Sequence, residues 1–458
     1  MNLTLNDIVN LLKSRQPFMQ KGPVRGISID SRTIGPDMLF FAIQGDYFDG
    51  HDFVDEVFQK GAAAAVVSEN WLKGRTDNRI GPMIPVENPL KALQDLAKSY
   101  RKQFDIPVIA ITGSNGKTTT KEMVAAVLET RFRVLKTEGN QNNHIGLPLT
   151  LLHLEEDTDI AVLEMGTNHF GEIKTLCQIA DPTYGLITNI GKGHLAFFKD
   201  VEGVFRAKSE LSEYLKNQGM LILNGDDTFL TRLLDDSGRK STFGFSENCD
   251  LRGSEQQIGG TGLHMMVDGK MKVTLSVPGR HNLYNALAAI AVGRLFQIPD
   301  SAIQDALQQY KPSDKRSRIF RSEGITLLDD TYNANPSSII AALRTLKEID
   351  GLNRTVAVLG DMLELGESSQ SEHQKVGEWI VELKYDAFFC FGSAMQHAAE
   401  RALSLGGQQV FHFSQKDDLI SQLQAYVKDG DGMVVKGSRG MRMEEIVEAF
   451  VHKETVNH

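Results

Sequence analysis

Short apolar runs alternate with stretches of helical periodicity through the middle of the chain. The clearest pair is Val108–Thr112, an apolar run of strand length, followed by helical spacing over Lys117–Thr130. Further strand-like runs occur at residues 134–135, 160–163, 184–190 and 220–223. Strands that alternate with helices favour a parallel sheet with right-handed crossovers, so this stretch is predicted to be an α/β unit.

The end of this middle stretch has a different pattern. Within Leu263–Val277, two strand-like runs flank Asp268-Gly269, a dipeptide typical of hairpin turns. Helical spacing follows over Asn282–Phe296. The middle unit is therefore expected to contain a hairpin and to close with a helix.

The flanking stretches also mix strands and helices. Before the middle unit, we predict strands at 24–29, 38–43 and 63–67 and helices at 51–61 and 89–104. After it, we predict strands at 325–328, 355–359, 387–391 and 433–435 and helices at 337–348, 373–383 and 443–451, a second doubly wound α/β unit. Proline in Ile106-Pro107 discourages helix continuation, and Lys311-Pro312 begins the third segment. We expect three domains, at residues 1–105, 106–311 and 312–458.

Length and charge support this division and exclude several classes of protein. A chain of 458 residues allows three domains at roughly 150 residues each. With 41% hydrophobic and 24% charged residues, the composition argues against long disorder, collagen and coiled coil. The 49 basic and 59 acidic residues give a net charge of −10, which disfavours a broad nucleic-acid-binding face.

The cysteines and the start of the chain indicate the compartment. Cys177, Cys249 and Cys390 lie far apart, so we expect neither a disulfide framework nor a cysteine zinc site. The first residues lack the pattern of a secretory signal, and no apolar run approaches the roughly 20 residues that span a bilayer. These features predict a soluble, cytoplasmic protein.

The most specific motif joins the predicted strand at 108–112 to the helix that follows. It reads Gly113-Ser114-Asn115-Gly116-Lys117-Thr118-Thr119, shorter than the strict G-x-x-x-x-G-K-[ST] pattern. The glycines allow a tight turn whose N–H groups face phosphate, the lysine neutralises phosphate charge, and the threonine hydroxyl suits Mg²⁺. A glycine turn before an amphipathic helix is the alternative interpretation, but every part of a phosphate loop is present in order.

Three further residues are candidates for chemistry beside this loop. Glu164 ends the apolar run at 160–163, where a buried carboxylate would need a partner such as a metal. His194 follows the run at 187–193, and Lys208 lies in a predicted helical context. The alternatives are a strand that surfaces at a loop, a solvated histidine and a surface lysine.

Blocks of sequence across almost the whole chain resemble the Mur ligases of bacterial peptidoglycan synthesis. They are the phosphate loop, Gly139–Pro148, Glu164–Gly166, Thr188–His194 and Gly279–Ala286. In the third segment, Asp329–Pro336 and Gly360–Gly366 look like the branch that adds D-alanyl-D-alanine, and the histidine usual in amino-acid-adding members is absent from Tyr332–Pro336.

The resemblance implies a fold and a reaction. The fold is a UDP-substrate-binding N-terminal domain, a central parallel-sheet ATPase and a C-terminal Rossmann-like ligase domain. In the implied reaction, ATP phosphorylates the terminal carboxylate of UDP-N-acetylmuramoyl-tripeptide. The amine of D-alanyl-D-alanine then attacks the acyl phosphate, which gives an amide, ADP and phosphate. Relatives imply a monomer.

The resemblance also implies roles for individual residues. The catalytic residues would be Lys117, His194 and Lys208. The ATP contacts would be Gly113, Ser114, Asn115, Gly116, Lys117, Thr118, Thr119, Asn282, Asn285, Arg318 and Asp330. Two Mg²⁺ ions would contact Thr118, Glu164, His194 and Lys208, and Lys208 matches a lysine that is carbamylated in several members. The substrates would contact Ser31, Arg32, Asn333, Asn335 and Lys436.

Several alternatives stay open at this point. Asn282 could cap a helix, Lys436 could belong to a basic turn after a strand, and Ser31-Arg32 could be an ordinary turn. The chain could be a ligase that adds a single amino acid, a folylpolyglutamate synthetase, or a nucleotide-binding regulator without ligase chemistry. The sequence does not distinguish meso-diaminopimelate from lysine as the third residue of the tripeptide.

Overall fold

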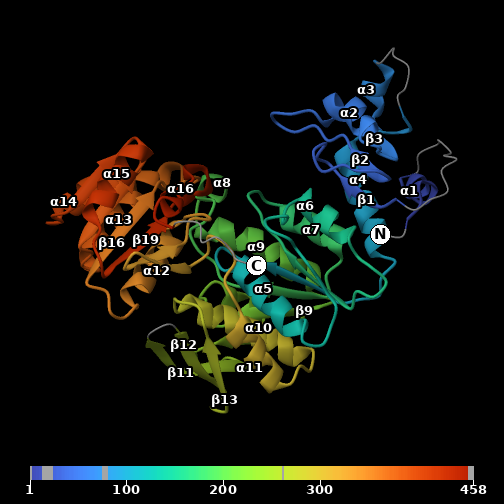
Figure 1. Ribbon diagram of the computed structural model, residues 1–458. Helices are drawn as coiled ribbons and strands as arrows, with labels where there is room; N and C mark the ends of the chain where they lie inside the picture. Colours follow the sequence, from blue (N-terminus) through green and yellow to red (C-terminus); the bar gives the residue numbers. More distant parts are fainter. Residues whose placement is uncertain (1–2, 13–23, 75–80, 260–261, 452–458) are drawn as a thin grey trace.

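Three sheets, each built from one stretch of the chain, organise the molecule. The computed structural model describes all residues except 1–2, 13–23, 75–80, 260–261 and 452–458. In Figure 1 the three units follow one another along the chain, with the central one between the other two. The predicted α/β class with parallel sheets is confirmed.

The N-terminal unit is a four-stranded parallel sheet in the order β1-β2-β3-β4. The strands are Gly26–Ser28, Met38–Phe41, Ala64–Ser68 and Met83–Val86; the helices are α1 (Leu5–Leu11), η1 (Gly50–Phe53), α2 (Val54–Gln59), α3 (Glu69–Lys73) and α4 (Pro89–Arg101). The helix predicted at 51–61 is split, since Asp49 caps a 3-10 turn at the N–H of His51 before α2 begins. The strand β4 was not predicted, because Pro85 interrupts a very short apolar run.

The central unit holds a nine-stranded sheet in the order β13-β12-β11-β10-β9-β8-β5-β7-β6. The strands β5 to β11 run parallel, and β12 and β13 add antiparallel pairs at one edge. The strands are β5 (Val108–Thr112), β6 (Val134–Lys136), β7 (Ile160–Glu164), β8 (Tyr184–Ile187), β9 (Met220–Asn224), β10 (Arg239–Gly244), β11 (Leu251–Gly259), β12 (Gly262–Val267) and β13 (Met271–Leu275). The helices are α5 (Lys117–Leu128), α6 (Gly146–Leu151), α7 (Glu172–Ala180), α8 (Leu195–Phe198), α9 (Val201–Leu215), η2 (Leu230–Asp235), α10 (His281–Leu295) and α11 (Asp300–Gln309).

Two details of the central unit differ from the prediction. The strand β8 ends at Ile187 rather than at residue 190, because Thr188 and Asn189 turn away to bond the phosphate loop. The helix at 281–295 does not close the unit, since α11 follows it and packs on α5 and β13. The predicted hairpin is confirmed as β12 and β13.

The C-terminal unit is a six-stranded sheet in the order β14-β15-β19-β16-β17-β18, parallel except for β14 at the edge. The strands are Arg318–Ser322, Ile325–Asp329, Arg354–Gly360, Ala387–Phe391, Val410–Phe413 and Asp431–Lys436, for β14 to β19. The helices are α12 (Pro336–Lys347), η3 (Gly366–Ser368), α13 (Ser369–Glu382), α14 (Met395–Ser404), α15 (Lys416–Tyr426), η4 (Arg439–Met441) and α16 (Glu444–Glu448). The helix predicted at 443–451 is therefore shorter than expected.

Apolar cores join the units as well as fill them. One cluster contains side chains of the N-terminal sheet, of α4 and of one face of the central sheet. Another contains Leu195 and Phe198 of α8 together with Met362 and Leu365 of the C-terminal unit. Figure 1 places α8 at the border of that unit. The loop before α8 is thus held against the C-terminal unit by apolar packing.

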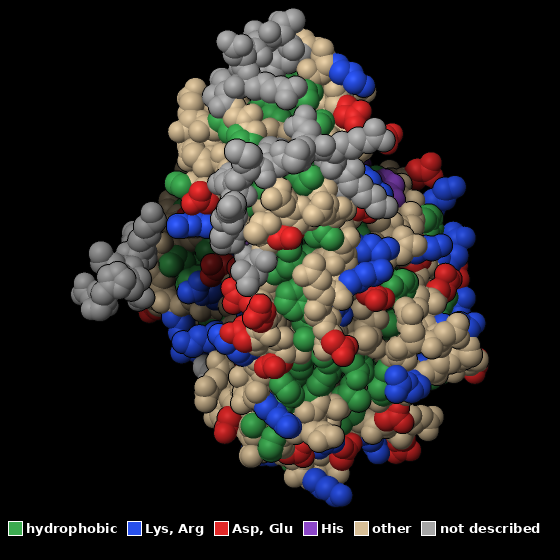
Figure 2. All heavy atoms as spheres, turned by 90° about the vertical axis from the view of Figure 1, so that its right-hand side faces the viewer, with side chains coloured by type: hydrophobic (Ala, Val, Ile, Leu, Met, Phe, Trp, Pro, Cys, Tyr) green, Lys and Arg blue, Asp and Glu red, His purple; other side chains and the backbone are tan. Residues whose placement is uncertain are grey.

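Two further features concern the charges on one face and the apolarity of the helices. On the face shown in Figure 2, Lys and Arg side chains are intermixed with Asp and Glu. None of the helices in the described part of the chain has the length and apolarity that a membrane-crossing helix requires.

Candidate active site

The phosphate loop takes a shape that only glycine allows at two positions. Gly113 has a φ of +144° and Gly116 a φ of +79°, and α5 begins directly afterwards at Lys117. A Cβ on Gly113 would lie 2.0 Å from Oγ1 of Thr188, and one on Gly116 would lie 2.5 Å from Oδ1 of Asn285. The loop therefore packs its backbone against two neighbouring elements and points the N-terminus of α5 at the space above it.

Side chains after β8 hold the loop in this shape. The side chain of Asn189 accepts a hydrogen bond from Asn115 N and donates one to Asn115 O, both at 2.9 Å. The Thr188 hydroxyl donates to the same carbonyl at 2.6 Å, and Ser114 N donates to Asn189 O at 2.9 Å. These bonds fix the loop without a ligand, so binding a phosphate there would cost little ordering of the backbone.

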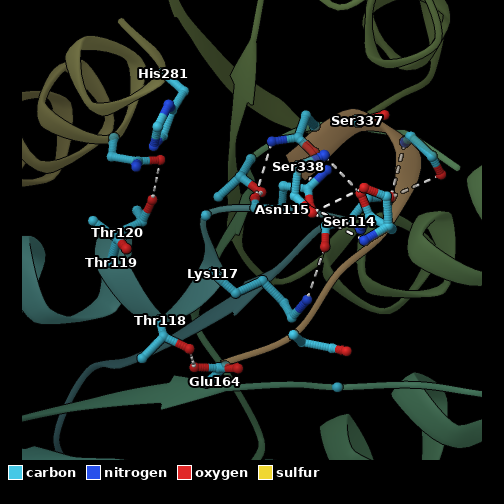
Figure 3. A pocket seen from close by; sticks show the side chains of 18 of the residues that line it. Ser114, Asn115, Lys117, Thr118, Thr119, Thr120, Glu164, His281, Ser337 and Ser338 are labelled. Atoms are coloured by element: carbon cyan, nitrogen blue, oxygen red, sulfur yellow. Dashed lines mark hydrogen bonds between the residues drawn. The ribbon is translucent and has the colours of Figure 1, made fainter. Parts of the chain in front are cut away.

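Lys117 lies over the loop. Its ammonium donates to the carbonyl of Ser114 at 3.3 Å (Figure 3) and to that of Gly113 at 2.8 Å. Burial lowers the pKa of Lys117, while the charge of Glu164 acts in the opposite direction. The carbonyls thus keep a partly desolvated cation where a phosphate would neutralise it.

Glu164 ends β7, which pairs with β5, and Thr118 lies in the first turn of α5, which follows β5. Their side chains face each other. Thr118 Oγ1 donates to Glu164 Oε2 at 2.7 Å (Figure 3). Asn142 Nδ2 donates to Glu164 Oε1 at 2.7 Å. Glu164 is only 2% exposed. A hydroxyl and a buried carboxylate fit Mg²⁺, which usually binds few protein ligands and completes its shell with phosphate and water. No group of three His, Cys, Asp or Glu side chains that could hold a metal occurs among the described residues.

Lys208 is buried in α9, at 2% exposure. Burial lowers its pKa well below the usual value, and the charge of Lys117 lowers it further. Its Nζ has neither a hydrogen bond nor an ion pair with any residue that the structure describes. Lys208 is therefore not a surface lysine, and its burial disfavours the charged ammonium form.

His194 lies beside the same cavity, but its ring is engaged across a unit boundary. Its backbone is left-handed, with a φ of +55°, and its Nδ1 lies 2.6 Å from Oε2 of Glu364 in the C-terminal unit. The hydrogen bond from His194 lowers the pKa of the Glu364 carboxyl. The structure thus connects a histidine of the central unit to a carboxylate of the next unit.

The cavity has a volume of about 670 Å³ and extends between the central and C-terminal units. Asn285 lines it, and Asn282 stands behind, donating to Pro278 O and accepting from Asn285 Nδ2 at 2.9 Å. Thr120 donates to Asn285 Oδ1 at 3.0 Å. Phe243, Tyr284 and Ala288 also line the cavity, and apolar or aromatic side chains of this kind suit a flat ring.

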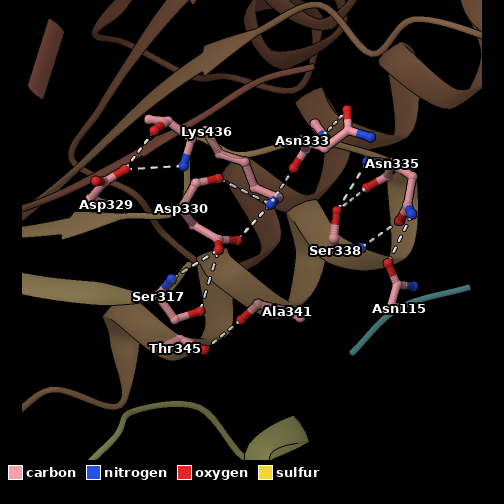
Figure 4. Close-up of polar contacts among 12 residues, drawn as sticks. Asn115, Ser317, Asp329, Asp330, Asn333, Asn335, Ser338, Ala341, Thr345 and Lys436 are labelled. Carbon is pink, nitrogen blue, oxygen red and sulfur yellow. Dashed lines mark hydrogen bonds and ion pairs between the residues drawn. The ribbon is translucent and has the colours of Figure 1, made fainter. Parts of the chain in front are cut away.

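Residues of the C-terminal unit close the other wall (Figure 4). Lys436 Nζ lies 2.5 Å from Asp330 Oδ2 and donates to Asn333 O at 2.7 Å. Asn335 caps α12 at Ser338 N and donates from Nδ2 to Asn115 Oδ1 at 2.8 Å. The last bond ties the phosphate loop directly to the C-terminal unit.

Some candidates lie outside this cavity. Arg318 is on β14, where it forms an ion pair with Asp314 at 2.8 Å. Ser31 and Arg32 lie after β1 in the N-terminal unit, where the Arg32 hydrogen bond lowers the pKa of Asp30 to about 2. Arg32 carries a largely exposed guanidinium, paired with that carboxylate at 2.6 Å. The predicted substrate contacts Ser31 and Arg32 are therefore not among the cavity-lining residues, whereas Asn333, Asn335 and Lys436 are.

Arg316 was missed by the sequence reasoning. It lines the cavity, and its Cζ lies 3.8 Å from the centroid of the Tyr332 ring. Two arginines separated by one residue carry no signal about which of them faces a site, so only the three-dimensional structure could identify Arg316. The same holds for the aromatic lining residues, which lie on a strand and a helix far apart in sequence.

Comparisons with known proteins agree with these features. Three domain families match the chain: "Mur ligase family, catalytic domain" at residues 23–101, "Mur ligase middle domain" at 111–293 and "Mur ligase, glutamate ligase domain" at 315–439. The chain is 37% identical to the UDP-N-acetylmuramoyl-tripeptide--D-alanyl-D-alanine ligase of Bacillus subtilis (strain 168), over 98% of both chains.

Solved structures give the same result. MurF from Acinetobacter baumannii superposes with a TM-score of 0.89 at 30% identity, over 98% of both chains. MurF from Thermotoga maritima in complex with ADP gives a TM-score of 0.81 at 28% identity, over 93% of this chain and 97% of that one. From the domains matched, the identity and the shared fold, we conclude that this chain belongs to the Mur ligase family.

Proposed function

We propose that the chain ligates D-alanyl-D-alanine to UDP-N-acetylmuramoyl-tripeptide with ATP, through an acyl phosphate, in the last step of UDP-muramoyl-pentapeptide synthesis. The observation that carries this proposal is the cavity in which a phosphate loop, a buried carboxylate and polar groups of the C-terminal unit meet. The Bacillus subtilis relative carries this ligase name over nearly its whole length. Because the reaction consumes ATP and a UDP-linked precursor, we place it in the bacterial cytoplasm, and we propose a monomer.

The loop would hold the triphosphate. Backbone N–H groups at the N-terminus of α5 and the ammonium of Lys117 face the space where the β- and γ-phosphates would bind. Thr118 and Glu164 would hold one Mg²⁺, and His194 with a carbamylated Lys208 would hold a second. When bound, these ions neutralise phosphate charge. Lys117 stabilises the charge that spreads over the transferred phosphoryl group.

The reaction itself needs two anions to approach each other. A carboxylate oxygen of the tripeptide attacks the γ-phosphorus, and the bond to the ADP oxygen breaks. The amine of D-alanyl-D-alanine then attacks the acyl carbon, phosphate leaves, and the amine loses a proton. Cations concentrated around one cavity lower the barrier of the first step, because they offset the repulsion between the two anions.

We assign each unit a part in this reaction. Residues 1–105, with Ser31 and Arg32, would bind the UDP end of the acceptor, and residues 106–311 would bind ATP. Residues 312–458 would bind the dipeptide through Asn333, Asn335 and Lys436, and would complete the nucleotide site with Asp330. Docking of the C-terminal unit on the phosphate loop through Asn335 and Asn115 would then complete the site only when the units close.

The direct test is phosphate release from ATP with each substrate supplied alone and both together. We expect release to require both UDP-N-acetylmuramoyl-tripeptide and D-alanyl-D-alanine. Parallel assays with tripeptides ending in meso-diaminopimelate or lysine would identify the acceptor. Release with neither substrate, or with folate and glutamate in their place, would overturn the proposal.

Arg316 provides a prediction about nucleotide binding. Its guanidinium lines the cavity and lies close enough to Lys117 to lower that group's pKa, so we infer that it contacts the phosphates. We expect Arg316→Ala to weaken ADP binding by about tenfold or more, the loss of one charged hydrogen bond. Titration calorimetry with ADP measures this, with the exposed Arg321→Ala on the same strand region as control. Arg318→Ala, measured in parallel, shows whether Arg318 also contributes.

A further inference from the structure

The carboxylate of Glu364 reaches from the C-terminal unit to a histidine of the central unit. His194 Nδ1 and Glu364 Oε2 lie 2.6 Å apart, and Ala196 N donates to Glu364 O at 2.9 Å. Both residues have left-handed backbones, with φ values of +55° for His194 and +61° for Glu364. Such a backbone is uncommon for residues with a Cβ, and each costs on the order of 1 kcal/mol or more to maintain.

Neighbouring contacts also hold the loop that carries His194 against the C-terminal unit. Lys192 Nζ donates to Glu372 Oε1 at 2.7 Å, so two side chains of the loop before α8 contact carboxylates of the C-terminal unit. Leu195 and Phe198 of α8, the helix that follows the loop, belong to the apolar cluster of that unit. The position of His194 beside the cavity therefore depends on the unit that carries Glu364.

The geometry also selects one form of the imidazole. In the neutral imidazole, a carboxylate that faces Nδ1 favours the tautomer with its proton on that nitrogen, which leaves a lone pair on Nε2. No residue in the described part of the chain forms a hydrogen bond with Nε2 of His194. A histidine in this form is suited to bind a metal ion, and carboxylate partners of metal-binding histidines typically set both the tautomer and the ring orientation.

We infer that Glu364 is a positioning residue: it sets the tautomer and orientation of His194 and makes the metal site of the central unit depend on docking of the C-terminal unit. This inference rests on the proposed function, in which His194 holds the second ion. Glu364 is not among the residues that line the cavity, so we expect its effect on the reaction to pass through His194.

Two variants of Glu364 and one control variant of Glu367 separate this role from a general effect of charge. Glu364→Ala removes the acceptor, and we expect kcat to fall roughly 10- to 100-fold. Glu364→Gln keeps an oxygen that accepts from Nδ1, and we expect it to recover most of that loss. Glu367→Ala removes an exposed carboxylate three residues away, and we expect it to match the wild-type chain.

A double mutant tests whether Glu364 acts through His194. In the His194→Ala background, Glu364→Ala should cause no further loss of kcat, because the group it positions is already gone. If Glu364→Ala lowers kcat by the same factor with and without His194, or if it behaves like Glu367→Ala, the inference is wrong.

Metal binding gives a readout that does not depend on turnover. We would titrate Mn²⁺ into the full chain with ADP present and follow free Mn²⁺ by electron paramagnetic resonance. We expect His194→Ala and Glu364→Ala to weaken the same class of sites about tenfold or more, while the class that Glu164→Ala removes stays intact. If His194→Ala changes neither Mn²⁺ binding nor kcat, the proposed metal role of His194 fails; if only Glu364→Ala is without effect, the positioning role fails.

Discussion

Replacement of Lys117 by alanine is expected to lower ATP-dependent product formation by roughly 10³-fold or more. The ammonium lies over the phosphate loop, bonded to the carbonyls of Gly113 and Ser114, and it is partly desolvated. Charge on the transferred phosphoryl group grows in this low-dielectric space, where one fixed cation has a large effect. Phosphate release in the presence of both substrates measures the loss.

The control for this variant is Lys102→Ala, which removes an exposed lysine at the end of α4. We expect its turnover to equal that of the wild-type chain. Circular dichroism shows whether Lys117→Ala remains folded, which we expect because the loop bonds to Asn189 do not involve the lysine side chain. Wild-type turnover in Lys117→Ala would contradict a catalytic role for the loop.

Replacement of Lys208 by alanine is the second change with a large expected effect. Burial holds the pKa of Lys208 well below its usual value, which favours the neutral amine over the ammonium form. A neutral amine can add CO₂ and become an anion, whereas the ammonium form cannot. If the carbamate is the active form, Lys208→Ala should lose about 10²-fold or more in turnover, and added formate or acetate should restore part of it.

Two comparisons make this prediction specific. Lys216→Ala, which removes an exposed lysine at the end of α9, should keep wild-type turnover and should not respond to short carboxylates. The wild-type chain should lose turnover in CO₂-free buffer and regain it when bicarbonate is added. Absence of both the chemical rescue and the CO₂ dependence would contradict carbamylation.

The parts of the fold that could be predicted are those specified by local sequence. The strand β5, the glycine turn and the start of α5 are adjacent in the chain, and their apolar period and glycine positions suffice to identify them. In contrast, β10 begins with polar residues and β11 is rich in polar residues and glycine, so neither shows strand periodicity. Their pairing with β9 and β12 is decided by tertiary structure.

The residues of the site also divide into those that the sequence could predict and those that only the tertiary structure brings together. Thr118 and Glu164 were expected to lie together because adjacent parallel strands end at one edge of a sheet, and the structure brings them to 2.7 Å. The pair of His194 and Glu364 spans 170 residues, and no periodicity in either stretch connects them. Arg316 precedes β14 and Arg318 begins it, with Ser317 between them at a left-handed φ of +49°, so local sequence does not show which arginine faces the cavity. The roles of Ser31 and Arg32 stay predictions.

The central claim is that the loop at residues 113–119 binds the triphosphate next to an ion held by Thr118 and Glu164. A crystal structure of the chain with a non-hydrolysable ATP analogue and Mn²⁺ tests it most directly, because anomalous scattering locates each ion. We expect the γ-phosphate within hydrogen-bond reach of Lys117 Nζ and an Mn²⁺ bound to Thr118 and Glu164. A triphosphate bound elsewhere, with no ion beside this loop, would contradict the account.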